Sequence, residues 1–183
     1  MPVAESPRPE RTDAQRNRAR ILEVAREVLA VDGDASLNSI AKKAGVGQGT
    51  LYRHFPTREA LVLAVYRAEI QRVVDWTPEL VESSATASVA LRAWFAHLAE
   101  LLRIKRGLAD AVTAAGHDAM TTESHGPVIS AIARILRAGE ADGSLRPGLD
   151  PDDVLMVMSC VWRVPAGEQA ERLLDLILDA VRA

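Results

Sequence analysis

The sequence has a single cysteine, Cys160, so an intrachain disulfide and a cysteine-based zinc site are both excluded. It also has no run of about 18 consecutive apolar residues, which a membrane-spanning helix requires. Residues 1–20 are polar and arginine-rich, with no apolar stretch of the signal-peptide type. These absences favour a soluble cytoplasmic protein, in which Cys160 is expected to be a buried structural thiol.

The chain has no overall excess of positive charge, since its net charge is -3 over 183 residues. Its basic residues are nevertheless concentrated near the N-terminus, namely Arg8, Arg11, Arg16, Arg18, Arg20, Lys42, Lys43, Arg53 and Arg58. After Trp76, acidic residues outnumber basic ones. This asymmetry is typical of a DNA-binding head on a non-binding body, although solvated surface arginines are the alternative explanation.

Helical periodicity predicts an all-α fold of about nine helices. Residues 1–12 hold three prolines and no apolar period, which predicts a flexible arm. Apolar residues at spacings of three and four then predict helices and no strands. The predicted helices cover residues 13–31, 36–44, 47–55, 57–76, 87–105, 108–120, 127–142, 151–164 and 167–182. We therefore expect an N-terminal domain over 13–56, a linking helix over 57–76 and a helical C-terminal domain over 77–183.

Residues 36–55 have the pattern of a helix-turn-helix, with two short helices separated by Ala44-Gly45-Val46. Ile40-Ala41 is expected to pack the first helix on the second, and Leu51 to anchor the second helix from beneath. Gly45 permits the sharp bend between them. The outer face of the second helix is then free to enter a major groove, which is about 12 Å wide.

The same segment resembles the N-terminal module of the TetR family. The resemblance spans about residues 15–70 and is carried by Ile40-Ala41, Ala44-Gly45-Val46, Gly49, Leu51-Tyr52 and His54-Phe55. Gly47 departs from the family pattern, which has Ser or Thr as the helix cap, at a loss of only a few tenths of a kcal/mol. The resemblance implies a homodimeric regulator, commonly a repressor, that leaves a palindromic operator when a small apolar effector binds.

The resemblance also implies which residues read the bases. Gln48, Gly49 and Thr50 begin the recognition helix, nearest the base edges, and Gln48 is suited to bidentate reading of adenine. Arg53 is a further candidate base reader. Asn38 and Ser39, near the start of the preceding helix, are expected to touch the DNA backbone or a base edge.

A second set of residues is implied to hold phosphates. Tyr52 and His54 resemble the family's phosphate contacts, and Thr57 with Arg58 is expected to bind another phosphate at the start of the next helix. Lys42 or Lys43 would add positive charge. For all these polar residues, a solvated helix face is the alternative.

The last two predicted helices have apolar faces wider than one core needs, which resembles the family's four-helix dimer bundle. The expected interface residues are Val154, Leu155, Met158, Val161, Trp162, Leu174, Ile177, Leu178 and Val181. The alternative is that they fill the core of a single protomer.

In the middle of the chain, large apolar residues alternate with small ones, which favours an effector cavity. Its expected lining is Trp94, Phe95, His97, Leu98, Leu101, Thr113, His117 and Met120. An aromatic stripe at helical spacing is also typical of an ordinary core.

No cofactor or metal site is expected, because the histidines lack supporting ligands at metal-binding spacing. No Ser-His-Asp set or Gly-rich phosphate loop is recognisable, so a helical enzyme is a remote alternative. A DNA-binding regulator without effector control is the nearer one.

Overall fold

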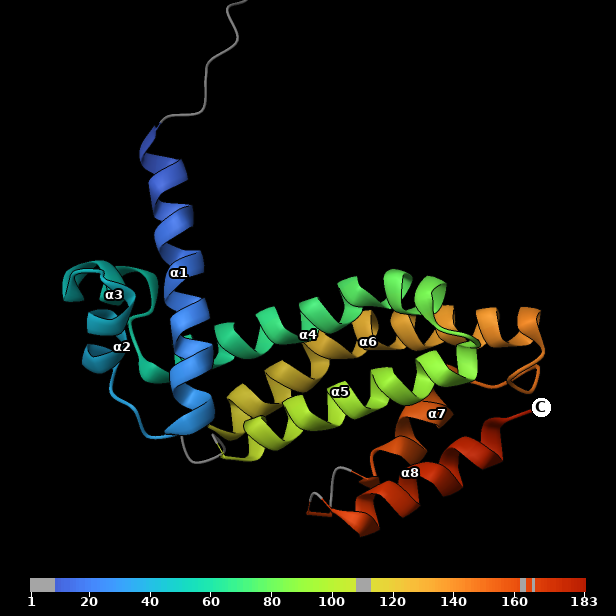
Figure 1. Ribbon diagram of the computed structural model, residues 1–183. Helices are drawn as coiled ribbons and strands as arrows, with labels where there is room; N and C mark the ends of the chain where they lie inside the picture. Colours follow the sequence, from blue (N-terminus) through green and yellow to red (C-terminus); the bar gives the residue numbers. More distant parts are fainter. Residues whose placement is uncertain (1–8, 108–112, 162–163, 166) are drawn as a thin grey trace, which may run out of the picture. The chain divides into compact units, whose positions relative to one another are not determined.

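The computed structural model describes residues 9–107, 113–161, 164–165 and 167–183. Over these residues the chain forms eight α-helices and no strands (Figure 1), which confirms the predicted all-α class. One isolated antiparallel bridge joins Leu145 to Arg182. None of the described helices combines the length and apolar character that crossing a membrane requires.

The helices are α1 (Pro9–Val31), α2 (Leu37–Ala44), α3 (Gln48–His54), α4 (Arg58–Ser83), α5 (Ala87–Gly107), α6 (Ala114–Asp142), α7 (Pro151–Met158) and α8 (Glu168–Val181). They form two compact units. The first comprises residues up to Tyr66 together with Gly107–Gly116, and the second comprises Arg67–Arg106 and His117–Ala183. Helix α4 contributes its first turns to the first unit and its remainder to the second.

The core of the first unit is built from one apolar face of each of its helices. Its buried residues include Ile21, Ala25, Leu29, Ile40, Ala44, Leu51, Phe55 and Leu61. Their spacing of three and four places them on the same side of each helix, so the helices bury these side chains against one another. This packing confirms the predicted roles of Ile40 and Leu51 in the helix-turn-helix core.

Prolines mark helix boundaries less often than we predicted. Helix α1 begins at Pro9, inside the predicted arm, because a proline in the first turn lacks only an N–H that no helix would bond. Helix α4 continues through Pro78, and α6 continues through Pro127, so that residues 114–120 of the predicted helix 108–120 and the predicted helix 127–142 belong to one helix. Residues 108–112 of that prediction lie outside the described residues. Buried residues follow each internal proline, Leu80 after Pro78 and Val128 and Ile132 after Pro127, and their burial opposes the roughly 3 kcal/mol that such a proline costs.

Trp94 is fully buried in the second unit, and its polar atom is satisfied there. The indole Nε1–H donates to the Thr77 hydroxyl at 2.9 Å and to the Val73 carbonyl at 3.2 Å. Thr77 in turn donates to the Val73 carbonyl at 3.1 Å. Phe95 packs against the Trp94 ring edge-to-face, with 5.4 Å between ring centroids. These contacts join α4 to α5 with no unsatisfied indole N–H.

The segment after α6 fastens the end of that helix to α5. The Asp142 carboxylate accepts hydrogen bonds from the backbone N–H groups of Ala87 at 2.7 Å and Ser144 at 2.8 Å. The Ser144 hydroxyl and the Ala87 N–H lower the pKa of Asp142, because both stabilise its charged form. Gly139 leaves room for Leu145, since a Cβ at Gly139 would lie 2.7 Å from the Leu145 Cβ.

Helix α7 is shorter than predicted, since it ends at Met158 and not at Val164. The Ser159 hydroxyl donates to the Met156 carbonyl at 2.6 Å, a local hydrogen bond that competes with helix continuation.

The prediction that Cys160 is buried is wrong: the thiol is exposed. Its apolar neighbours in sequence do not bury it, because α7 has already ended and only one side of this segment faces the core.

Candidate nucleic-acid interface

Ser36 sets the start of α2. Its hydroxyl accepts a hydrogen bond from the backbone N–H of Ser39 at 3.2 Å, and the Ser39 hydroxyl donates to the Ser36 carbonyl at 2.8 Å. This reciprocal cap satisfies one of the amides that a helix N-terminus leaves unpaired. The Ser39 hydroxyl, which we predicted to reach DNA, is thus already hydrogen-bonded within the protein. Asn38 and Lys42, predicted on the same helix, are exposed.

Gly45 turns the chain from α2 into α3. Its φ of 66° and ψ of 30° lie in the left-handed region, where a side chain is disfavoured. The next residue closes the turn, because the Val46 N–H donates to the Ala41 carbonyl at 3.1 Å. The predicted bend at Gly45 is thereby confirmed in its backbone geometry.

Helix α3 is held from one side only. Leu51 is completely buried, and Gly47 caps the helix through its backbone without a side-chain hydrogen bond. On the other side, Gln48, Gly49 and Arg53 are exposed, and Tyr52 retains 43% of its surface. Thr50 and His54 are half-buried at the edges of this face. The structure thus presents the six residues predicted on α3 at or beside one polar surface.

The segment that carries this surface has basic residues and no acidic ones. Between Asp34 and Glu59 the sequence contains four basic residues, Lys42, Lys43, Arg53 and Arg58, and no acidic residue. A surface with cations and without carboxylates attracts a polyanion such as duplex DNA.

Arg58 has a structural role that we did not predict. Its guanidinium donates to the carbonyl oxygens of Gly33 and Ala35, which ties α4 to the turn between α1 and α2. Thr57 likewise serves the fold, because its hydroxyl accepts from the Ala60 N–H at 3.0 Å and caps α4. Both residues therefore position the helix-turn-helix, and a phosphate contact would come in addition to these bonds.

Four of the residues predicted to line an effector cavity lie in the core of the second unit. Trp94, Phe95, Leu98 and Leu101 are buried there. His97 is exposed, and its ring centroid lies 5.5 Å from that of Trp76. Thr113 belongs to the first unit. The side chains of His117 and Met120 lie outside the described residues.

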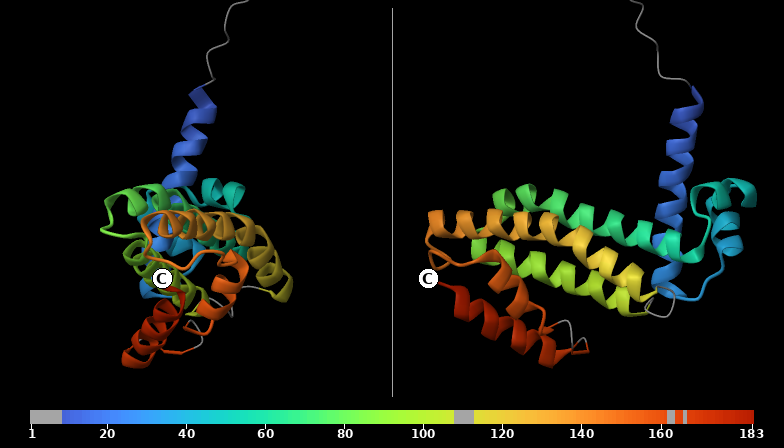
Figure 2. Two further views of the ribbon diagram at one scale, coloured as in Figure 1. Left: turned by 90° about the vertical axis from the view of Figure 1, so that its right-hand side faces the viewer. Right: turned by 180° about the vertical axis from the view of Figure 1, so that it is seen from behind.

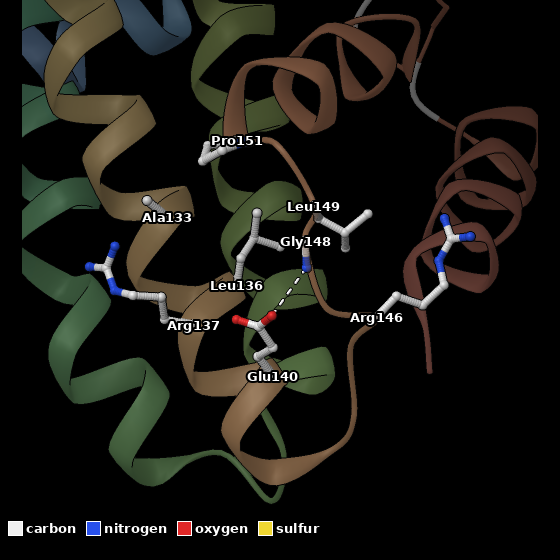
Figure 3. A pocket seen from close by; sticks show the side chains of 8 residues that line it. All are labelled: Ala133, Leu136, Arg137, Glu140, Arg146, Gly148, Leu149 and Pro151. Carbon is white, nitrogen blue, oxygen red and sulfur yellow. Dashed lines mark hydrogen bonds between the residues drawn. The ribbon is translucent and has the colours of Figure 1, made fainter.

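A hollow of about 220 Å³ lies elsewhere in the second unit, between α6 and the segment leading into α7 (Figure 3). Its walls include Leu136 and Leu149, and the Glu140 carboxylate accepts from the Gly148 N–H at 3.1 Å. The side chains of Arg137 and Arg146 point away from it to either side. None of the predicted cavity residues lines this hollow.

Most of the predicted interface residues, on α7, just after it and on α8, are buried within the protomer. These are Val154, Met158, Val161, Leu174, Leu178 and Val181. Leu155 and Ile177 are half-buried, and Trp162 lies outside the described residues. The large apolar residues that remain exposed on these two helices are Met156 at 71%, Val157 at 50% and Leu176 at 66%. Periodicity identified the helices but not which apolar side faces outward.

Sequence reasoning also missed a contact between Glu59 and Thr113. The Glu59 carboxylate, in the first turn of α4, accepts from the Thr113 backbone N–H at 2.9 Å and from its hydroxyl at 2.7 Å. The Thr113 hydroxyl also accepts from the Gly116 N–H at 3.2 Å, at the start of α6. No local pattern signals a contact between residues 54 positions apart.

Two family profiles match the chain. Residues 21–65 match "Bacterial regulatory proteins, tetR family", and residues 73–183 match "Transcriptional regulator SbtR-like, C-terminal domain". Among curated proteins, the regulator UidR of Escherichia coli K12 is 38% identical over 73 residues, which is 39% of this chain and 37% of that protein. A Staphylococcus aureus HTH-type regulator, SAUSA300_2515, is 45% identical over 67 residues, 36% of this chain and 34% of that protein. These matches therefore span little more than a third of the relatives' length.

Solved structures match over nearly the whole chain. The TetR transcriptional regulator SCO0520 of Streptomyces coelicolor is 38% identical with a TM-score of 0.75, covering 90% of this chain and 98% of that one. A TetR regulatory protein of Mycobacterium vanbaalenii is 30% identical with a TM-score of 0.73, covering 96% and 100%.

The turn geometry predicts opposite effects for the same substitution at two nearby glycines. Gly45→Ala should lower the free energy of unfolding by about 1–2 kcal/mol, because alanine is strained in the left-handed region. The new Cβ would also lie 3.3 Å from Arg20 Nη2. Gly49→Ala is the matched control, since no atom lies within 4 Å of its Cβ position and alanine favours a helix. Urea unfolding at one protein concentration measures both, and equal stability of Gly45→Ala and wild type would contradict the argument.

Proposed function

The chain belongs to the TetR family of transcriptional regulators, and on that premise we propose that it is a homodimeric repressor released from a palindromic operator by a small apolar effector. The observation that carries the proposal is the exposed polar face of α3, which lies on a segment without acidic residues. Gln48 and Arg53 on that face have the hydrogen-bonding groups that read bases, while Tyr52 and His54 suit phosphates.

Dimerisation follows from the small size of the reading surface. A recognition helix of seven residues contacts few base pairs, and two copies related by a two-fold axis double the site. Helices α7 and α8 supply a surface for this purpose, because Met156, Val157 and Leu176 are large apolar side chains exposed on two helices in contact with each other. Burial of such side chains against a second copy would remove them from water.

Effector release requires a connection between the helical body and the DNA-binding head. The bonds between Thr113 and Glu59 supply a candidate, since Thr113 caps α6 and Glu59 lies in the first turn of α4. An effector that displaces α6 would pull on α4 and change the separation of the two recognition helices in the dimer. Because the spacing of operator half-sites is fixed, contacts would be lost on both sides. A regulator without effector control is the alternative.

Recovery of bound genomic DNA tests the DNA-binding function. The wild-type protein should enrich fragments that share a palindrome with half-sites about one helical turn apart. Tyr52→Ala and His54→Ala should each weaken binding to that palindrome about tenfold, through loss of a charge-assisted hydrogen bond. Arg134→Ala, an exposed residue of α6, is the control and should bind as wild type does. Enrichment without a shared sequence would argue against an operator-binding regulator.

Substitution of the exposed apolar residues tests the dimer. Met156→Glu and Leu176→Glu should each weaken association by about 2 kcal/mol, because each places an unpaired charge in an apolar interface. Val89→Glu is the matched control, since Val89 is also an exposed apolar residue, at 52%, but lies on α5. Sedimentation equilibrium gives the dissociation constants. Unchanged association in both interface variants would place the interface elsewhere.

The role of Thr113 is tested with an effector identified from a broad panel of apolar compounds. Thr113→Val removes the hydroxyl bond to Glu59 and should reduce the effector-induced loss of operator affinity by about 0.5–2 kcal/mol. Thr122→Val, an exposed threonine of α6, is the control. Operator titrations with and without the compound measure the effect. If no compound in the panel changes operator affinity, the alternative without effector control is favoured.

A further inference from the structure

Helix α1 extends beyond the core of the DNA-binding head. From Asp13 to Arg20 none of its residues is buried, and the first buried residue is Ile21. The N-terminal turns stand clear of α2 and α3 in each view (Figures 1 and 2). Packing within this unit therefore does not explain the presence of arginines on these turns.

Two arginines at the base of this extension lie beside the helix-turn-helix. The guanidinium of Arg18 lies over the ring of Phe55, and the distance from Arg18 Cζ to the ring centroid is 5.3 Å. Arg20 Nη2 lies 3.3 Å from the position that a Cβ would occupy on Gly45. Phe55 follows the last residue of α3, and Gly45 lies in the turn that precedes α3. The two guanidinium groups are thus beside the residues that flank the recognition helix.

These two cations differ from their neighbours on α1 in their charge partners. Arg16 pairs with Asp13 at 2.6 Å, and Arg26 pairs with Glu23 at 2.9 Å. Arg18 and Arg20 are exposed, and in the described ranges neither has a carboxylate within 4.0 Å. Within the part of the chain that the structure describes, no carboxylate neutralises their positive charge. The ring of Phe55 holds the Arg18 guanidinium in place without removing its charge.

We infer that Arg18 and Arg20 bind phosphates of the DNA backbone on either side of the recognition helix, an inference that rests on the proposed DNA-binding function. The seven-residue helix α3 would lie within the major groove, which is about 12 Å wide and admits one helix. Phosphates line both edges of that groove. A helix in the groove therefore has phosphates on both sides of it, and cations beside the residues that flank the helix are placed to bind them and to position the helix without reading sequence.

The salt dependence of binding to a 30-base-pair duplex of arbitrary sequence tests this role, because each phosphate neutralised contributes about 0.9 to the slope of log affinity against log salt. The double variant Arg18→Gln/Arg20→Gln should lower the slope by about 1.8. Between 50 and 200 mM salt, wild-type affinity should accordingly fall about 12-fold more than that of the variant. The matched control is Arg26→Gln/Arg72→Gln, which removes two arginines already paired with Glu23 and Glu69.

A change of fold is distinguished from a loss of phosphate contacts by two further variants. Arg18→Lys/Arg20→Lys keeps both charges and should retain the wild-type slope. Arg20→Gln alone leaves the Arg18 contact with Phe55 intact and should lower the slope by about 0.9. Circular dichroism verifies that each variant has the helix content of wild type.

An unchanged slope in Arg18→Gln/Arg20→Gln, or an equal decrease in the control, would overturn the inference while leaving the proposed function intact. A wild-type protein that binds no duplex even at 50 mM salt would overturn both. Because the probe has no operator sequence, failure to find an operator does not affect this test.

Discussion

The left-handed backbone at Gly45 is the constraint on which the proposed DNA-binding surface depends. It lets the chain reverse within a few residues, so that α2 and α3 share a core while α3 is buried on one side only. Leu51 supplies the attachment from beneath, and the polar residues opposite it remain in solvent. A side chain at Gly45 would add backbone strain and would crowd Arg20. The same glycine therefore shapes the turn and leaves space for a cation beside it.

Polar side chains around this motif divide into those that hold it and those that remain available. Ser36, Thr57 and Arg58 make hydrogen bonds with backbone groups, and these bonds set where α2 and α4 begin and how α4 meets the turn after α1. Gln48 and Arg53 are exposed on α3. This division is expected of a surface that must meet DNA with a fixed shape, since side chains already bonded within the protein keep the free ones in position.

In the described part of the second unit, aromatic residues predicted to line an effector cavity are buried in the core. Large and small apolar residues alternate in the sequence, yet Trp94 and Phe95 pack against each other, and the Trp94 indole is satisfied by Thr77 and Val73. Helix α6 passes through Pro127 because its following turns are buried. In the first unit, by contrast, Thr113 joins the start of α6 to Glu59 in the first turn of α4.

The sequence by itself determined the helical class, the turn at Gly45 and the exposed face of α3, because helical periodicity and glycine conformation are local properties of the chain. Only the tertiary structure decided that α6 is continuous, that Arg58 bonds to Gly33 and Ala35, and that Met156 and Leu176 face outward. Each of these depends on contacts between residues distant in sequence. Periodicity shows that a helix has an apolar side, but only packing shows which apolar residues that side leaves in water.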